Sequence, residues 1–165
     1  MKTRYFLMAG LLLGSLTAGS TGNDPASAFS RLKTLVGEWQ GTSPKGEVFT
    51  STIRPVSNGT ALEETFQNSE DNQMVTLYTP DGDRLLITHY CSTGNQPRMQ
   101  TVPVKAGQKE FAFSLTGVSN LKSPAAGHMQ NMALQIVDED HFTEQWTWRE
   151  NGKDMTETFR FARKK

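Results

Sequence analysis

Residues 73–91 read QMVTLYTPDGDRLLITHYC, and this stretch decides the fold. Its two halves, 73–79 and 84–91, are rich in Thr, Leu, Ile and Tyr and alternate in polarity, as strands with one buried face do. Asp81-Gly82-Asp83 separates them. Asp-Gly between alternating segments is a strong hairpin signal, because both residues tolerate the positive φ of the favoured turns. The stretch therefore predicts an antiparallel β-hairpin.

The same pattern recurs along the rest of the chain, with turn chemistry such as Asn58-Gly59 and Asn151-Gly152 between the alternating segments. The expected strands are 37–43, 46–55, 60–67, 73–79, 84–91, 98–104, 110–116, 128–137, 141–149 and 153–162. Ten strands in sequential hairpins must close on themselves or leave long edges open to aggregation. We therefore predict an all-β protein, an antiparallel up-and-down β-barrel of about ten strands, with a two-sheet sandwich as the alternative.

A short N-terminal helix precedes the strands. Asp24 suits the cap and Pro25 the first helical position, and Gly37 ends the run. Apolar residues recur between them at helical spacing: Phe29, Leu32, Leu35 and Val36. A helix of about ten residues does not stand alone in water. We expect it to pack on the barrel and to plug or brace one mouth.

Residues 1–20, MKTRYFLMAGLLLGSLTAGS, have the three-part form of a secretory signal peptide: a basic start, an apolar stretch and small residues. An uncleaved membrane anchor is the alternative, although the apolar stretch is shorter than the roughly 20 residues of a spanning helix. We predict that residues 21–165 form one barrel domain in the periplasm or outside the cell. Monomer and homodimer both remain open.

The charge balance limits the classes of binding partner. The whole chain has 17 basic and 17 acidic residues, and loss of the leader removes Lys2 and Arg4, which leaves a net charge of −2. Nucleic-acid binding needs a basic surface, so it is not expected, and nothing after the leader resembles a membrane span. Cys91 is the single cysteine, which excludes an internal disulfide. We expect a buried inert thiol there, with a reactive nucleophile as the alternative.

Ionisable residues interrupt several apolar strand faces. Glutamates stand in the middle of three such faces, at 64, 144 and 157, and histidines stand on two, His89 and His128. A buried carboxylate is costly unless it is paired or hydrogen-bonded, so these residues suggest a hydrated or ligand-filled interior, with Arg98 and Arg54 as candidate partners. The alternatives are a local register error or a bulge for the glutamates, and satisfied core positions for the histidines.

Two connections are longer than a hairpin needs, residues 92–97 and 117–127, and they are the candidates for a portal. The histidines lack metal-ligand spacing, and no phosphate loop or GxSxG nucleophile motif is present in the sequence. We therefore expect no metal site. The tryptophans, among them Trp146, are expected to pack the core or to line a cavity.

The run LVGEWQG at 35–41 resembles the Gly-x-Trp signature of the calycins, which include lipocalins, fatty-acid-binding proteins and nitrobindin-like barrels. The segments DGDRLLITHYCSTGNQPRM (81–99), NLKSPAAGHM (120–129) and HFTEQWTWRENGK (141–153) are similar to exported bacterial calycin-like proteins of unknown function. The resemblance implies a lipocalin-like or nitrobindin-like barrel. Nitrobindin-like barrels bind haem through a late histidine, but the last expected strand contains no His, so no axial ligand is transferred.

The leading hypothesis is a barrel that binds a small, partly polar ligand in its interior. The expected ligand-binding residues are His89, Arg98 and His128 near the portal, Glu64, Glu144 and Glu157 deeper, and Trp146. No cofactor is expected, with haem as the alternative. The alternative function is a small enzyme, for example an isomerase or hydrolase, that uses a cavity histidine and glutamate for acid–base chemistry.

Overall fold

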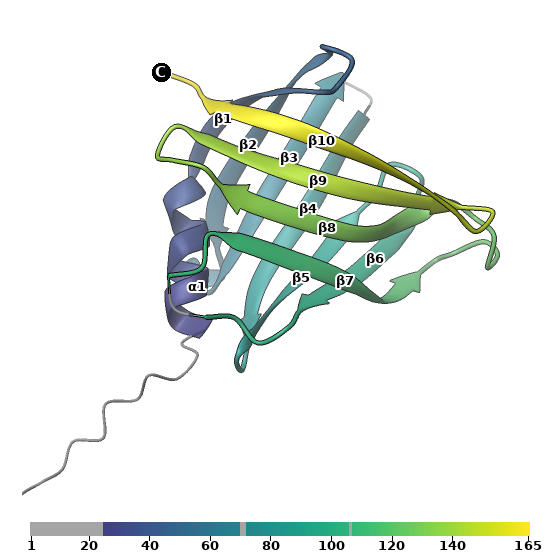
Figure 1. Cartoon of the computed structure of the whole chain (residues 1–165), viewed down its shortest axis with the longest axis horizontal. Helices are drawn as coiled ribbons and strands as arrows, with labels where there is room; N and C mark the ends of the chain where they lie inside the picture. The colour runs from purple at the N-terminus through teal and green to yellow at the C-terminus, as the bar shows by residue number, and fades with distance from the viewer. Residues whose placement is uncertain (1–24, 70–71, 106) are drawn as a thin grey trace, which may run out of the picture.

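The computed structural model describes residues 25–69, 72–105 and 107–165, and these residues form a closed barrel of ten antiparallel strands (Figure 1). The strands are β1 (Gly37–Thr42), β2 (Val48–Val56), β3 (Ala61–Ser69), β4 (Asn72–Asp81), β5 (Arg84–Tyr90), β6 (Gln96–Thr101), β7 (Glu110–Ser119), β8 (His128–Ile136), β9 (His141–Glu150) and β10 (Lys153–Arg163). Each strand pairs with the next, and β1 pairs with β10 to close the barrel. The expected barrel is confirmed, and the sandwich is excluded.

Alternation along the strands divides the side chains between the interior and solvent. In β9, for example, Phe142, Glu144 and Trp146 are buried, whereas His141 and Gln145 are exposed. Directly paired residues of antiparallel strands lie on the same face, so the register shows which side chains share the interior. Opposite Phe142 lies Phe161 of β10, and the two rings stack with their centroids 4.2 Å apart.

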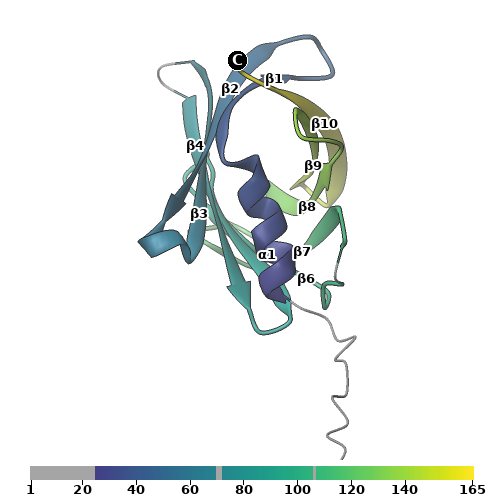
Figure 2. The ribbon, with the colours of Figure 1, turned by 90° about the vertical axis from the view of Figure 1, so that its left-hand side faces the viewer.

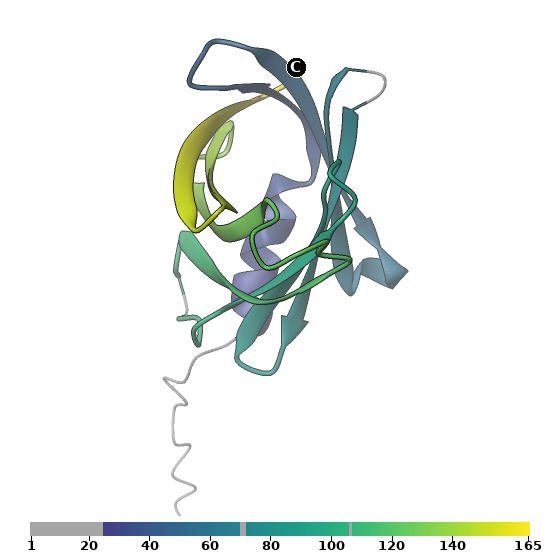
Figure 3. The same cartoon turned by 90° about the vertical axis from the view of Figure 1, so that its right-hand side faces the viewer.

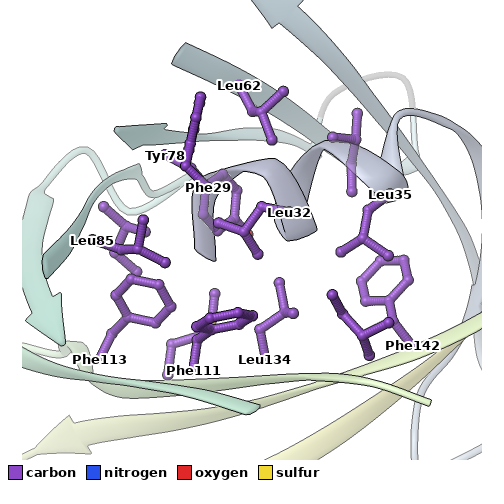
Figure 4. Close-up of a cluster of buried hydrophobic side chains, with 14 of the residues drawn as sticks. Phe29, Leu32, Leu35, Leu62, Tyr78, Leu85, Phe111, Phe113, Leu134 and Phe142 are labelled. Carbon is purple, nitrogen blue, oxygen red and sulfur yellow. The ribbon is translucent and has the colours of Figure 1, made fainter. Parts of the chain in front are cut away.

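Helix α1 (Pro25–Leu32) and the 3₁₀ turn η1 (Lys33–Leu35) lie across one end of the barrel (Figure 2). Phe29, Leu32 and Leu35 are buried and point toward apolar side chains of the barrel wall, Leu134 and Phe111 among them (Figure 4). The expected bracing role of the helix is therefore confirmed. Asp24, the expected cap, lies outside the described residues.

Two side chains fasten this end of the barrel. Trp39 of β1 is fully buried, and its indole N–H donates to the carbonyl oxygen of Leu35 at 2.8 Å. The guanidinium of Arg163 lies 4.1 Å from the centroid of the Trp39 ring. It also donates to the carbonyl oxygens of Thr34 and Val36, each at 3.0 Å. The first and last strands, which pair with each other, thus both bond to the backbone of the helical segment and the residue after it.

Several expectations concern other parts of the chain. The expected signal peptide, residues 1–20, lies outside the described residues. Within the described part of the chain, no helix has the length and apolarity to cross a membrane. Cys91 is a buried free cysteine, as expected.

Candidate functional site

The barrel interior has two unlike halves. Toward the helix, the side chains form an apolar cluster that includes Leu62, Tyr78 and Leu134 (Figure 4). Figure 3 views the barrel from the opposite end. Toward that end, polar side chains lie among the apolar ones. The buried members of this polar group are Ser51, Glu64, Thr76, His89 and Glu144. Because water is excluded from these positions, their hydrogen bonds decide their chemistry.

Glu64 of β3 and Glu144 of β9 meet at the Tyr78 hydroxyl. Tyr78 Oη lies 2.6 Å from Glu64 Oε2 and 3.1 Å from Glu144 Oε1. Ser51 Oγ donates to Glu64 Oε1 at 2.7 Å, and the Trp146 indole N–H donates to Glu144 Oε2 at 2.9 Å. Both carboxyl groups are 2% exposed. Each is therefore held in place by neutral donors deep inside the barrel.

Burial changes the acid–base behaviour of Glu144 and Tyr78. Burial and the nearby charge of Glu64 raise the pKa of Glu144 well above its usual range. Burial and the two carboxyl groups also raise the pKa of Tyr78, which stays a phenol. A phenol has one proton, so Tyr78 cannot donate to both carboxyl groups at once, and its contact with Glu64 is the shorter of the two. Glu64 also receives the hydrogen bond from the Ser51 hydroxyl.

His89 of β5 provides an unsatisfied polar atom beside this pair. The residue is 4% exposed, and its Nδ1 lies 2.9 Å from Thr76 Oγ1. Its Nε2 has no hydrogen-bond partner among the described residues. Burial lowers the pKa of His89 to about 4, so the ring is neutral at physiological pH. An unpaired buried nitrogen costs about 1–3 kcal/mol, which a bound polar group would recover.

A cavity of about 40 Å³ lies between these side chains. It is lined by Glu64, Phe66, Met74, Thr76, His89, Met129, Glu144, Trp146 and Phe159. The Trp146 ring lies against His89, with their centroids 4.7 Å apart. Most of the lining is apolar, and the polar atoms converge from one side, as in small-molecule sites. We refer to these nine residues as the barrel pocket.

The pocket brings together four of the residues predicted from sequence, His89, Glu64, Glu144 and Trp146. The other three, Glu157, Arg98 and His128, do not line the pocket. Glu157 faces inward opposite Trp146 in the β9–β10 register but is only half-buried and does not line the pocket. Arg98 is exposed on β6, where its Nη1 donates to Ser119 Oγ at 2.7 Å.

The expectation that Arg98 and Arg54 pair with the inward-facing glutamates is therefore wrong. Arg54 pairs with the neighbouring Glu63 on the outer face of β2 and β3, with Nη2 2.7 Å from Oε1. Arginine side chains are long and strongly hydrated, so they stay at the surface where water and carboxylates are both available. The buried carboxyl groups use hydroxyl and indole donors instead.

His128 also does not reach the pocket. A register shift between Met129 and Asn131 marks a bulge in β8, and Met129 rather than His128 faces inward there, opposite Trp148. His128 pairs with Arg149 on the other face, and its Nδ1 contacts the Ala126 carbonyl oxygen at 2.9 Å. A bulge adds one residue and reverses the alternation, which explains why the strand pattern misplaced this histidine.

The two long connections lie side by side at the end of the barrel away from the helix. Asn95 Nδ2 donates to the Gly127 carbonyl oxygen at 2.8 Å, and Asn120 Nδ2 donates to Gln96 Oε1 at 2.8 Å. A surface hollow of about 250 Å³ lies between them. Their role as a portal stays a prediction.

Sequence reasoning missed several residues that line the pocket or hydrogen-bond to its glutamates. Tyr78 and Thr76 alternate with Met74 on the fourth strand, and this parity was the available signal for all three. Ser51 alternates with Ile53 on the second strand in the same way. Met129 carried no signal, since the bulge that turns it inward has no mark in the sequence.

A haem does not fit this interior. The macrocycle is many times larger than a cavity of about 40 Å³. His128 has its Nε2 3.3 Å from Gln130 Oε1, and His141 is exposed beside Asp138. Among the described residues, no group of three His, Cys, Asp or Glu side chains is arranged to hold a metal ion.

Comparison with known proteins supports the fold alone. No family model matches the chain, and no curated protein matches it. A solved structure from Nostoc punctiforme PCC 73102, a protein of unknown function from the DUF3598 family, is similar, with a TM-score of 0.55 and 14% sequence identity. The match covers 81% of this chain and 48% of the other, so this chain spans about half of that protein.

Proposed function

We propose that the protein is a calycin-like binding barrel, exported to the periplasm or secreted, that holds a small, partly polar ligand in the barrel pocket. The observation that carries the proposal is the unpaired Nε2 of His89, buried at the wall of a cavity that Glu64, Glu144 and Trp146 also line. A filled structural core would pair or exclude such an atom. A ligand group at the cavity would satisfy it.

The shape of the pocket limits the ligand. About 40 Å³ holds one small polar group, so the remainder of the ligand extends between the half-buried side chains around it, Phe66, Met74, Met129 and Phe159. Methionine side chains are flexible and adapt to irregular shapes. The pocket is therefore suited to a small polar head with an apolar tail.

Methionine methyl groups offer a direct test. Met74 and Met129 line the pocket, Met99 lies in the closed core, and Met155 is exposed at the surface. NMR spectra of protein labelled at the methionine methyl groups, recorded against a mixed library of small soluble compounds, should show shifts of Met74 and Met129 only. The unmoved Met99 signal reports an intact core.

Two leucine variants complete this test. His89→Leu removes the unpaired nitrogen and should weaken every compound that shifts the pocket methyl groups. His141→Leu makes the same change at an exposed position of β9 and should leave binding unchanged. The proposal is wrong if no compound moves Met74 or Met129, or if both variants bind like the wild type.

A second candidate function is acid–base catalysis in the same pocket, because a neutral histidine and a protonated glutamate line one cavity. Such a pair could remove one proton and deliver another on a small carbonyl compound. Exchange of the α-protons of a small ketone in D₂O, followed by NMR, tests it. Catalysis requires exchange that His89→Leu and Glu144→Gln each abolish and that His141→Leu retains.

A further inference from the structure

We propose that the barrel pocket is selective for the ammonium group of a small primary amine, held by Glu64, Glu144 and His89, an inference that rests on the proposed ligand-binding function. Four features of the pocket favour an ammonium group: its acidic side chains, the number of hydrogen-bond acceptors around it, its size and the raised pKa of Glu144.

The two glutamates have no positively charged partner in the pocket. Ser51, Tyr78 and Trp146 are all neutral donors, and none of the nine pocket residues is a lysine or arginine. The arginines that form ion pairs in the described structure do so with other acidic residues, as Arg54 does with Glu63. The pocket thus holds two buried carboxyl groups and has no basic side chain in its lining. Since an isolated buried charge is costly, a positively charged ligand stabilises it and an anionic one does not.

The acceptors match an ammonium group in number. A primary ammonium has three N–H donors and no acceptor, like that of lysine. Oxygen atoms of the Glu64 and Glu144 carboxyl groups supply two of the three acceptors. His89 supplies the third in the tautomer whose Nδ1–H donates to Thr76, because Nε2 is then an unpaired acceptor at the cavity wall. A quaternary ammonium has no N–H and would leave this nitrogen unpaired.

The size of the cavity favours a short amine. A space of about 40 Å³ takes an ammonium head but not an aromatic ring. The Trp146 ring lines the cavity, and its π face attracts cations. The alkyl chain would lie against Phe66, Met74, Met129 and Phe159, which supply an apolar surface.

Binding of an ammonium should release a proton from Glu144. The N–H groups of the ligand favour the ionised carboxylate, so the Glu144 O–H bond breaks and its proton passes to the buffer. Tyr78 and His89 keep their protonation states, because the pKa of Tyr78 is raised and that of His89 is about 4. The residues around Glu144 on each neighbouring element are Glu64 of β3, Tyr78 of β4, His89 of β5, Leu134 of β8, Trp146 of β9, and Phe159 with the more distant Glu157 of β10.

Isothermal titration calorimetry with three matched probes tests the inference: n-butylammonium, n-butanol and butyrate, each at pH 7 in phosphate and in Tris. We expect butylammonium to bind and the other two to bind at least about tenfold more weakly, as the loss of a hydrogen bond to a charged group predicts. The apparent enthalpy should differ between the buffers, because the released proton ionises them with different heats.

Two glutamine variants locate the effect. Glu144→Gln should weaken butylammonium by about tenfold or more and abolish the difference between buffers. Glu63→Gln makes the same change next to Glu64 but on the outer face, and it should bind like the wild type. Unchanged methyl signals of Met99 and Met132 in both variants verify the fold.

The outcomes separate the two proposals. If butanol or butyrate binds as tightly as butylammonium, or if Glu144→Gln binds like the wild type, selectivity for amines is wrong, while shifts of Met74 and Met129 still support ligand binding. If butylammonium does not bind, the inference is also wrong. Ligand binding itself fails on its own test, if the mixed library also leaves those methyl groups unmoved or if His89→Leu and His141→Leu both bind like the wild type.

Discussion

Replacing Glu144 with Gln should stabilise the protein at neutral pH, although the side chain is buried and hydrogen-bonded. In the folded protein the raised pKa of Glu144 favours its protonated form; its Oε2 accepts from the Trp146 indole, and its Oε1 lies 3.1 Å from Tyr78 Oη. A glutamine amide of the same shape offers the same pattern, its oxygen toward Trp146 and its NH₂ toward Tyr78. The variant therefore keeps the folded-state contacts and loses only the ability to ionise in the unfolded chain.

The expected gain in the free energy of unfolding depends on pH, because the pKa of Glu144 is raised on folding. Because the pKa of Glu144 is raised on folding, its contribution to stability is fully present below the ordinary pKa of Glu, about 4.3. It is lost as pH rises from there through the raised folded pKa, since the unfolded chain has released a proton that the folded chain retains. Across this window the variant should gain about 1.4 kcal/mol over the wild type for each pH unit.

Urea unfolding between pH 4.5 and 8, followed by tryptophan fluorescence, measures this difference. The effect of His89 occurs in both proteins and cancels in the comparison. Glu63→Gln is the control, since it removes a surface ion pair and should change the free energy of unfolding by no more than about 1 kcal/mol, without the same slope. Parallel pH profiles for the wild type and Glu144→Gln, or a less stable variant at pH 7, would refute the protonated state.

The remaining predictions concern His89, the close packing of Gly41 against Phe49, and the hydrogen bonds of Arg163. The pKa of His89 is lowered to about 4, so its contribution to the free energy of unfolding is present above pH 6.5 and lost toward pH 4. In urea unfolding, the wild type and His141→Leu should therefore lose about 3 kcal/mol between these pH values, whereas His89→Leu should not. Gly41→Ala should lower the free energy of unfolding by about 1–3 kcal/mol in the same assay, because the new Cβ would overlap the Phe49 ring. Arg163→Lys should lower the thermal midpoint, with a loss of about 1–3 kcal/mol, since one ammonium cannot replace a guanidinium that bonds several carbonyl oxygens at once.

The architecture could be predicted because its signals are local. Asp-Gly and Asn-Gly turns and period-2 alternation act within a few residues, and each expected strand overlaps one of the ten strands in the structure. The strand ends differ by a few residues, as at β7, which extends to Ser119 rather than ending at 116. Hydrogen bonding across the sheet, which depends on the partner strand, sets those ends.

The site could be predicted only in part, because it depends on contacts between distant strands. Alternation placed Glu64 and Glu144 on inward faces, but nothing in either strand showed that Tyr78 would lie between them. The inward position of Met129 and the outward position of His128 both follow from the β8 bulge. Sequence alternation alone cannot detect such a change of parity.

Native mass spectrometry of the protein purified from its own host shows whether the barrel pocket holds a ligand. The wild type and His141→Leu should carry an adduct of one defined small mass that is lost on denaturation, and His89→Leu should lack it. The bare chain mass in all three proteins would contradict the claim.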